Sequence, residues 1–194
     1  MAVLQIRLEG DPVLRAKAAP VPKITKRIAK LLKDMEETMY AAEGVGLAAP
    51  QVGVSLRMFV ADAGDGPMVF VNPVLVEGRG SQVDSEGCLS IPGVYGYVER
   101  YESVVVTAED AKGKPRRVEA SGLLARVIQH EMDHLDGILF TDKATGITRP
   151  GDPHEQGAGK GTSAGRGADL GRDARAGDDA GAAPGPASAG GGDA

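Results

Sequence analysis

The segment "QHEMDHLDG", residues 129–137, places His130 and His134 four positions apart, with Glu131 directly after the first histidine. Residues four apart share one face of a helix, so both imidazoles can reach a single cation at about 2 Å from each nitrogen. Glu131 then lies near the open side of that cation, and burial raises a carboxyl pKa toward the range that is useful for proton transfer at neutral pH. The HExxH pattern is typical of metal-dependent hydrolases.

Two histidines do not complete a metal site, so the chain must supply a third ligand. One metalloprotease pattern continues with a third histidine, but its position is occupied by Phe140. Another protease class uses a downstream glutamate, and here Glu155, beside His154, lies in a glycine-rich segment rather than a helix that could aim it. These two residues stay as alternatives. Cys88, the single cysteine, is the remaining soft donor and the favoured third ligand.

The number of ligands indicates the kind of site. Structural zinc sites are normally closed by four protein ligands, whereas catalytic sites have three and keep a position for water. Cys88, His130 and His134 make three, and residues 1–150 contain no other cysteine or histidine. The set therefore predicts an enzyme. A metal-stabilised binding module that takes its fourth ligand from a partner chain is the non-enzymatic alternative.

The loop "GVGLAAPQV", residues 44–52, imitates the dinucleotide-binding pattern GxGxxA. That pattern needs a strand before it and a helix after it, whereas here a predicted helix precedes the loop and β-type residues follow it. The sequence therefore argues against NAD binding. The glycines instead allow the backbone to approach a substrate, and Gln51 offers an amide donor near the site.

Two stretches have helical spacing. Residues 24–43 repeat apolar side chains every three or four positions, which predicts a long amphipathic helix near the N-terminus. A second helix begins after Ser121, a candidate N-cap, ends at Gly137 and carries the HExxH motif. We expect this helix to be mostly buried, because its polar side chains share one narrow stripe and its apolar residues cover the rest. The stripe consists of Arg126, Gln129 and Asp133.

Three β-rich runs separate the helices. They cover residues 56–62, 68–76 and 103–120, and Gly113 divides the last one into a predicted hairpin. Sheet between two helices predicts an α+β fold with antiparallel or mixed sheets.

Composition and charge exclude several classes of protein. The chain has 194 residues, a net charge of -5 and a pI near 5.3, so net charge gives no sign of DNA binding. No apolar run approaches the roughly 20 residues that span a bilayer, and a lone cysteine favours a reducing compartment. From Gly151 onward 13 Gly and 11 Ala dominate the composition. We therefore expect one domain over residues 1–148 and a disordered Gly/Ala/Asp-rich tail over residues 149–194.

Three motifs taken together resemble the signature motifs of peptide deformylase: "GVGLAAPQ" (44–51), "EGCLS" (86–90) and "QHEMDHLDG" (129–137). The resemblance covers roughly residues 1–147. It implies a compact α+β domain with β-sheets around a central HExxH helix. It also implies a metal-dependent hydrolase of protein biosynthesis, which removes the formyl group from N-formylmethionine at the start of newly made polypeptides and releases formate.

The resemblance also implies a role for individual residues. One divalent metal would be held by Cys88, His130 and His134, with Fe²⁺ expected first and Zn²⁺, Ni²⁺ or Co²⁺ able to replace it. Glu131 would take a proton from the attacking water and pass it to the leaving amine. The oxyanion would meet the metal, the side-chain amide of Gln51 and the backbone N–H of Leu89.

Further positions carry over from the same resemblance. The backbone at Gly46 would align the peptide, and Val45, Leu123 and Val127 would line a methionine pocket. Glu86 and Arg100 are candidates for a supporting ion pair.

The expected partners are N-formylmethionyl nascent peptides in the bacterial cytoplasm, without a membrane. A transient ribosome contact is left open. Many family members follow the HExxH helix with a C-terminal helix, which in some contacts the ribosome, but nothing after Thr148 has helical periodicity.

Overall fold

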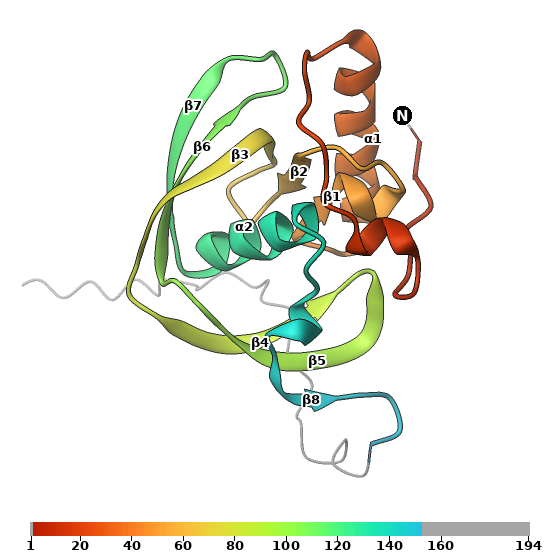
Figure 1. Cartoon of the computed structure of the whole chain (residues 1–194), viewed down its shortest axis with the longest axis vertical. Helices are drawn as coiled ribbons and strands as arrows, with labels where there is room; N and C mark the ends of the chain where they lie inside the picture. Colours follow the sequence, from red (N-terminus) through yellow and green to blue (C-terminus); the bar gives the residue numbers. More distant parts are fainter. Residues whose placement is uncertain (1, 153–194) are drawn as a thin grey trace, which may run out of the picture. The chain divides into compact units, whose positions relative to one another are not determined.

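The computed structural model describes residues 2–152, which contain two antiparallel sheets and two α-helices (Figure 1). One sheet has the strand order β1-β2-β3-β6-β7 and the other β4-β5-β8. The α+β class with antiparallel sheets agrees with the sequence prediction. The strands are β1 (Gly46–Ala48), β2 (Met58–Ala61), β3 (Met68–Arg79), β4 (Gln82–Cys88), β5 (Ile91–Arg100), β6 (Ser103–Glu109), β7 (Pro115–Ser121) and β8 (Thr145–Thr148).

Helix α1 spans Lys26–Ala41. Its N-cap is Thr25, whose side-chain oxygen accepts a hydrogen bond from the N–H of Ile28 at 3.3 Å and so satisfies one of the free donors of the first turn. One face of α1 buries Leu32, Met35 and Met39 against apolar residues of β1 and β2. The C-terminal end of α1 leads directly into the loop that carries the first motif.

The three-stranded sheet was not anticipated. The sequence predicted strands near β2, β3, β6 and β7, but it gave no strand for β4, β5 or β8. In β5 the inward positions include Gly96 and Arg100, while Tyr95 and Tyr97 point outward and are half exposed. Glycine and arginine inside and tyrosines outside blur the usual alternation of apolar inside and polar outside, so a pattern search for apolar alternation misses the strand.

Helix α2 spans Gly122–Leu135 and lies between the two sheets (Figure 1). Ser121 is its N-cap as predicted, although its side chain makes no capping hydrogen bond. Gly137 follows the helix with φ of 74°, and a Cβ there would come within 2.5 Å of the carbonyl oxygen of Arg15. The predicted stop signal is therefore confirmed, because only glycine fits both the backbone angle and the space.

Short 3₁₀ helices complete the described chain: η1 (Pro12–Arg15), η2 (Ala49–Val52) and η3 (Phe140–Asp142). No helix among residues 2–152 is long and apolar enough to cross a membrane. The predicted disordered tail falls almost wholly outside the described residues, as do the alternative ligands His154 and Glu155.

Candidate metal centre

The donor atoms of Cys88, His130 and His134 converge, although they come from β4 and α2. One ligand atom from each residue lies within 4.8 Å of the others, and Cys88 Sγ is 3.2 Å from His134 Nε2. A tetrahedral ion with bonds of roughly 2.3 Å to sulfur and 2.0 Å to nitrogen separates such donors by roughly 3.5 Å. The distance from Cys88 Sγ to His134 Nε2 is within a few tenths of an ångström of that value, and the third donor lies close enough for the three residues to hold a metal ion.

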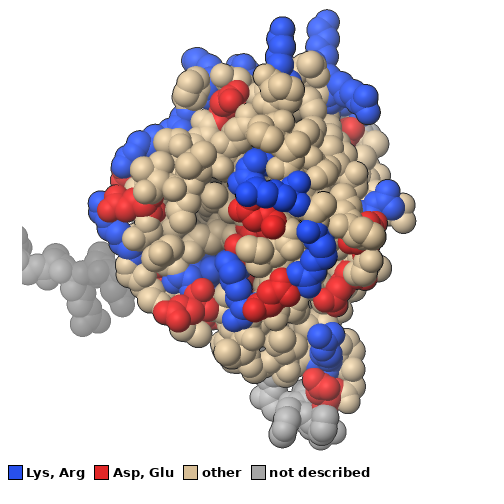
Figure 2. Space-filling view, in the orientation of Figure 1, with Lys and Arg blue, Asp and Glu red and all other residues tan. Residues whose placement is uncertain are grey.

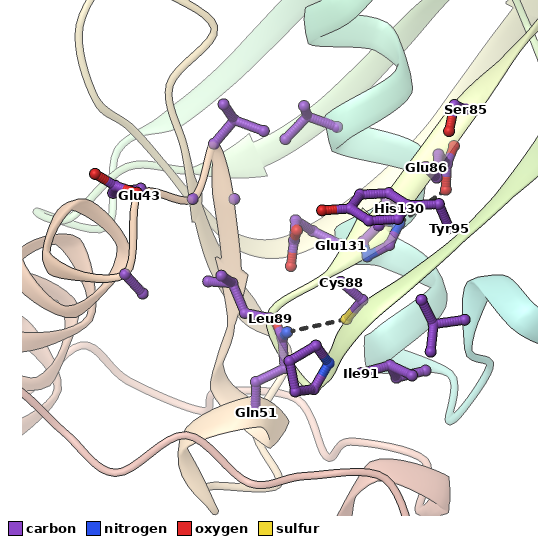
Figure 3. A pocket seen from close by; sticks show the side chains of 18 of the residues that line it. Glu43, Gln51, Ser85, Glu86, Cys88, Leu89, Ile91, Tyr95, His130 and Glu131 are labelled. Carbon is purple, nitrogen blue, oxygen red and sulfur yellow. Dashed lines mark hydrogen bonds and ion pairs between the residues drawn. The ribbon is translucent and has the colours of Figure 1, made fainter. Parts of the chain in front are cut away.

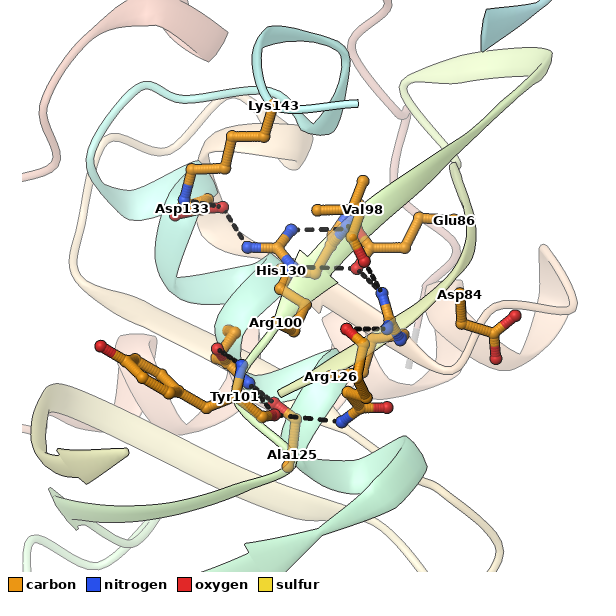
Figure 4. Close-up of polar contacts among 12 residues, drawn as sticks. Asp84, Glu86, Val98, Arg100, Tyr101, Ala125, Arg126, His130, Asp133 and Lys143 are labelled. Carbon is orange, nitrogen blue, oxygen red and sulfur yellow. Dashed lines mark hydrogen bonds and ion pairs between the residues drawn. The ribbon is translucent and has the colours of Figure 1, made fainter. Parts of the chain in front are cut away.

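Glu86 fixes the orientation of His130. Its Oε2 lies 2.9 Å from His130 Nδ1 (Figure 4). Burial alone would raise the pKa of Glu86, but hydrogen bonds from Arg100 and His130 outweigh it and hold the pKa well below its ordinary value. The ionised carboxylate can only accept, so Nδ1 carries a proton, which leaves Nε2 as the nitrogen that would bind the metal.

The guanidinium of Arg100 forms a two-pronged pair with Glu86, with Nε–Oε1 and Nη2–Oε2 both at 2.9 Å. The ion pair expected between these residues is confirmed. Arg100 also donates to Asp133 on α2, and Asp133 accepts from Lys143 (Figure 4). The pair therefore links β4, β5 and α2 rather than standing alone.

His134 is 1% exposed. Burial is the main cause that lowers its pKa well below the ordinary value of histidine. A neutral imidazole is the form that binds a metal. Its Nδ1 has no hydrogen-bond partner among the described residues.

Glu131 lies in the wall of a cavity with its Oε2 buried and without a hydrogen-bond partner among the described residues (Figure 3). Burial raises the pKa of Glu131 to about 7, opposed by His130 and assisted by Glu86. A Cβ on Gly46 would lie 2.3 Å from Glu131 Oε1 and 2.9 Å from Val127 Cγ1. Glycine at position 46 thus makes room for the carboxylate, a requirement the sequence alone did not reveal.

Gln51 is held beside the sulfur. Its Oε1 accepts from the N–H of Ala48 at 2.7 Å, and its Nε2 lies 3.5 Å from Cys88 Sγ and 3.2 Å from Ser90 Oγ (Figure 3). The accepted bond from Ala48 fixes which end of the amide faces the cysteine. Leu89 follows Cys88 at the turn between β4 and β5 and also lines the cavity.

The cavity has a volume of about 480 Å³, a size typical of small-ligand sites. It brings together nine of the ten residues predicted for the site, and the tenth, His134, contacts its member Cys88. Val45 and Leu123 are about half exposed and Val127 is buried, so the three differ in their access to solvent. Apolar and polar groups share the lining.

Comparison with known proteins decides the family. The family model described as polypeptide deformylase matches residues 3–150. The peptide deformylase of Pelotomaculum thermopropionicum is 54% identical over 149 residues, which cover 77% of this chain and 96% of that protein. The chain belongs to the polypeptide deformylase family. It is a hydrolase that removes the formyl group from an N-terminal methionine.

Solved structures of deformylases support the same assignment. The enzyme from Thermotoga maritima matches with a TM-score of 0.73 and 44% identity, covering 75% of this chain and 99% of that one. The enzyme from Synechococcus elongatus, solved in complex with actinonin, matches with a TM-score of 0.72 and 46% identity over 75% and 80% of the two chains.

Sequence reasoning missed the part that Arg126 plays in this deformylase. Arg126 is 4% exposed, and its Nη1 donates to Glu86 Oε1 at 2.7 Å and to the carbonyl oxygen of Val98 at 2.9 Å. Its Nη2 donates to the carbonyl oxygen of Gln82. The helical phase of Arg126 with Gln129 and Asp133 was visible, but a polar stripe on a helix does not by itself show that a sheet covers it.

Proposed function

We propose that this deformylase holds one divalent metal through Cys88, His130 and His134, with Fe²⁺ as the native ion. The convergence of these three donors beside Glu131 in one cavity is the observation that carries the proposal. When bound, a divalent ion supplies Lewis acidity and lowers the pKa of water. We infer that α2, which contacts both sheets, is the central scaffold, because it provides two of the ligands and Glu131.

Glu131 accepts the proton of the attacking water and delivers it to the departing amine. Its raised pKa of about 7 supports this role, because a group that both takes and gives a proton works best near the operating pH. The position of the carboxylate against the backbone of Gly46 places it at the cavity wall. The strand that carries Gly46 is an edge strand, so its backbone is available to align an extended peptide.

The side-chain amide of Gln51 and the backbone N–H of Leu89 stabilise the oxyanion. Both residues line the cavity, and the amide nitrogen of Gln51 faces Cys88. A prearranged donor of this kind typically contributes about 2.7 to 4 kcal/mol to transition-state stabilisation.

Val45, Leu123 and Val127 receive the methionine side chain. All three line the cavity, and an unbranched thioether chain gains from apolar walls. The physiological substrates are N-formylmethionyl nascent peptides. The enzyme binds them in the bacterial cytoplasm during a transient contact with the ribosome.

Formate release from an N-formylmethionyl peptide tests the proposal. Metal-loaded protein prepared without oxygen should release formate, and Glu131→Gln should slow the reaction by roughly 10²- to 10⁴-fold while the metal content stays constant. Equal rates in the two proteins would remove Glu131 from the mechanism.

Two further experiments separate the alternatives. Truncation after Pro150 removes His154 and Glu155 and should leave metal content and activity intact, whereas loss of both would favour a ligand from that segment. Actinonin, which was bound in the Synechococcus elongatus structure, should inhibit this chain; a site closed by four ligands would not respond.

A further inference from the structure

One face of the three-stranded sheet carries exposed apolar and aromatic side chains beside the cavity. Strand alternation and the register of β4 against β5 place six residues on this face. We call it the tyrosine face: Val83, Ser85, Gly87, Tyr95, Tyr97 and Glu99. Tyr95 and Tyr97 are each 54% exposed, and Val83 is 64% exposed. Val83 lies diagonally opposite Tyr97, within reach of an aromatic ring, so the three residues form one patch.

The tyrosine face begins at the wall of the cavity. Ser85 and Tyr95 line the cavity (Figure 3), as does Gly87. A Cβ on Gly87 would lie 2.9 Å from Tyr95 Cε1, so the ring of Tyr95 lies over β4 at the rim. Tyr97 is directly opposite Ser85, and the Cβ atoms of such a pair are about 5 Å apart. The patch is therefore continuous with the cavity.

Folding gives little reason for the exposure of these two tyrosines. Tyr40, which is also exposed, donates a hydrogen bond to Asp62 Oδ2 at 2.6 Å. In the described part of the chain, Tyr95 and Tyr97 use only their backbone groups in hydrogen bonds, including those that accept from threonines of β8. Contiguous exposed aromatic rings are typical of binding surfaces, because a ring contributes a large apolar contact at a low entropy cost.

The charge of the tyrosine face indicates the kind of partner. Figure 2 shows acidic and basic side chains next to one another across one face of the molecule. On the tyrosine face Glu99 is the one charged residue, and the only cation of β4 and β5 is Arg100, which is buried. Nucleic acids and anionic membranes are bound through Lys and Arg, so this face fits an apolar stretch of polypeptide better.

The position at the cavity rim decides between two polypeptide partners. A second copy of this chain on the tyrosine face would cover Tyr95 and so obstruct the cavity that Tyr95 lines. A peptide that leaves the cavity on this side instead crosses Tyr95 first and Tyr97 next. An extended chain advances about 3.3 to 3.6 Å per residue, so one or two residues span the step from Ser85 to Tyr97.

We propose that the tyrosine face binds the polypeptide substrate beyond the residues held in the cavity, and that it favours apolar side chains there. This inference rests on the proposed function, because it extends the same peptide path. The face makes longer formylated chains with an apolar segment better substrates than short formylated peptides.

The test compares formate release from formyl-Met-Ala-Ser and from the same peptide extended by Leu-Phe-Leu. Tyr97→Ser with Val83→Ser should raise KM for the hexapeptide and lower its kcat/KM roughly two- to tenfold. The kcat should stay constant, since the contact is equally strong in the ground state and the transition state. The tripeptide is too short to reach the patch and should be processed at the original rate. Tyr95 is kept in both proteins because it lines the cavity.

The matched control is Tyr101→Ser with Val74→Ser. It removes the same two kinds of side chain, which are 47% and 58% exposed and lie outside the cavity lining. Both peptides should be processed by this control as by the original protein. A hexapeptide that ends in Ser-Gly-Ser should lose its advantage over the tripeptide and show no effect of the substitutions at Tyr97 and Val83.

Three kinetic results would overturn the proposal: an equal loss on both peptides, an equal loss in the control variant, or an unchanged KM for the hexapeptide. A change of oligomeric state with an unchanged KM would assign the face to a second copy instead. If the original protein releases no formate from either peptide, the proposed function fails. Fluorescence anisotropy of a labelled Met-Ala-Ser-Leu-Phe-Leu peptide then decides the inference separately. Weaker binding to Tyr97→Ser with Val83→Ser than to the control supports it, and equal binding overturns it.

Discussion

On one face of α2, Ala125 and Ile128 are fully buried among apolar side chains of the five-stranded sheet. On another face, Arg126, His130 and Asp133 meet the three-stranded sheet through hydrogen bonds and ion pairs with Glu86 and Arg100 (Figure 4). The same helix therefore joins one sheet by apolar packing and the other by buried charges.

The two kinds of contact differ in how strictly they fix the geometry between α2 and each sheet. Apolar packing is non-directional, and a core accepts small changes of shape at modest cost. Buried ion pairs add little net stability but tolerate few geometries, because an unpaired buried charge is costly. Cys88 lies on β4 and the two histidines on α2, so a directional link between these elements sets the distance between the proposed metal ligands.

Glu86→Ala should have the largest effect. It leaves the guanidinium groups of Arg100 and Arg126 buried without their shared carboxylate, which should lower the free energy of unfolding by about 3 to 5 kcal/mol. It also removes the acceptor of His130 Nδ1, and metal affinity should fall by roughly 10- to 100-fold. Urea denaturation and a chelator competition measure the two quantities.

The control for this variant is Glu77→Ala, which removes an exposed carboxylate paired with Arg79 and should leave both measurements unchanged. If Glu86→Ala kept the original metal affinity, the buried charges between α2 and the three-stranded sheet would have only a structural role.

Arg126→Met should have an intermediate effect. The thioether chain fills part of the same space, but the carbonyl oxygens of Val98 and Gln82 lose their donor, at a cost of about 1 to 3 kcal/mol in unfolding free energy. Metal affinity should fall less than in Glu86→Ala, because Arg100 and His130 still hold the carboxylate. A loss of affinity as large as that of Glu86→Ala would mean that Arg126 acts on the ligands by another route.

Ile128→Val tests the apolar face and should have the smallest effect. Removing one buried methylene typically lowers the free energy of unfolding by about 0.5 to 1.5 kcal/mol. Metal affinity should not change, since Ile128 packs with the five-stranded sheet and contacts no part of the Glu86 network that the structure describes. A fall in metal affinity here would show that the two faces of α2 are not separable.

The sequence by itself determined the chemistry of the candidate site. The spacing of His130 and His134 follows from the period of a helix, and the lack of other soft donors in residues 1–150 points to Cys88. It also located both helices, because their apolar spacing is local and repeats over several turns.

Only the tertiary structure decided how that chemistry is held in place. The burial of Arg126 depends on the three-stranded sheet, whose inward glycine and arginine hide it from a search for apolar alternation. The need for glycine at position 46 depends on Glu131, which is far away in the sequence. Contacts of this kind join residues that no local pattern relates, since chain folding and not sequence spacing brings them together.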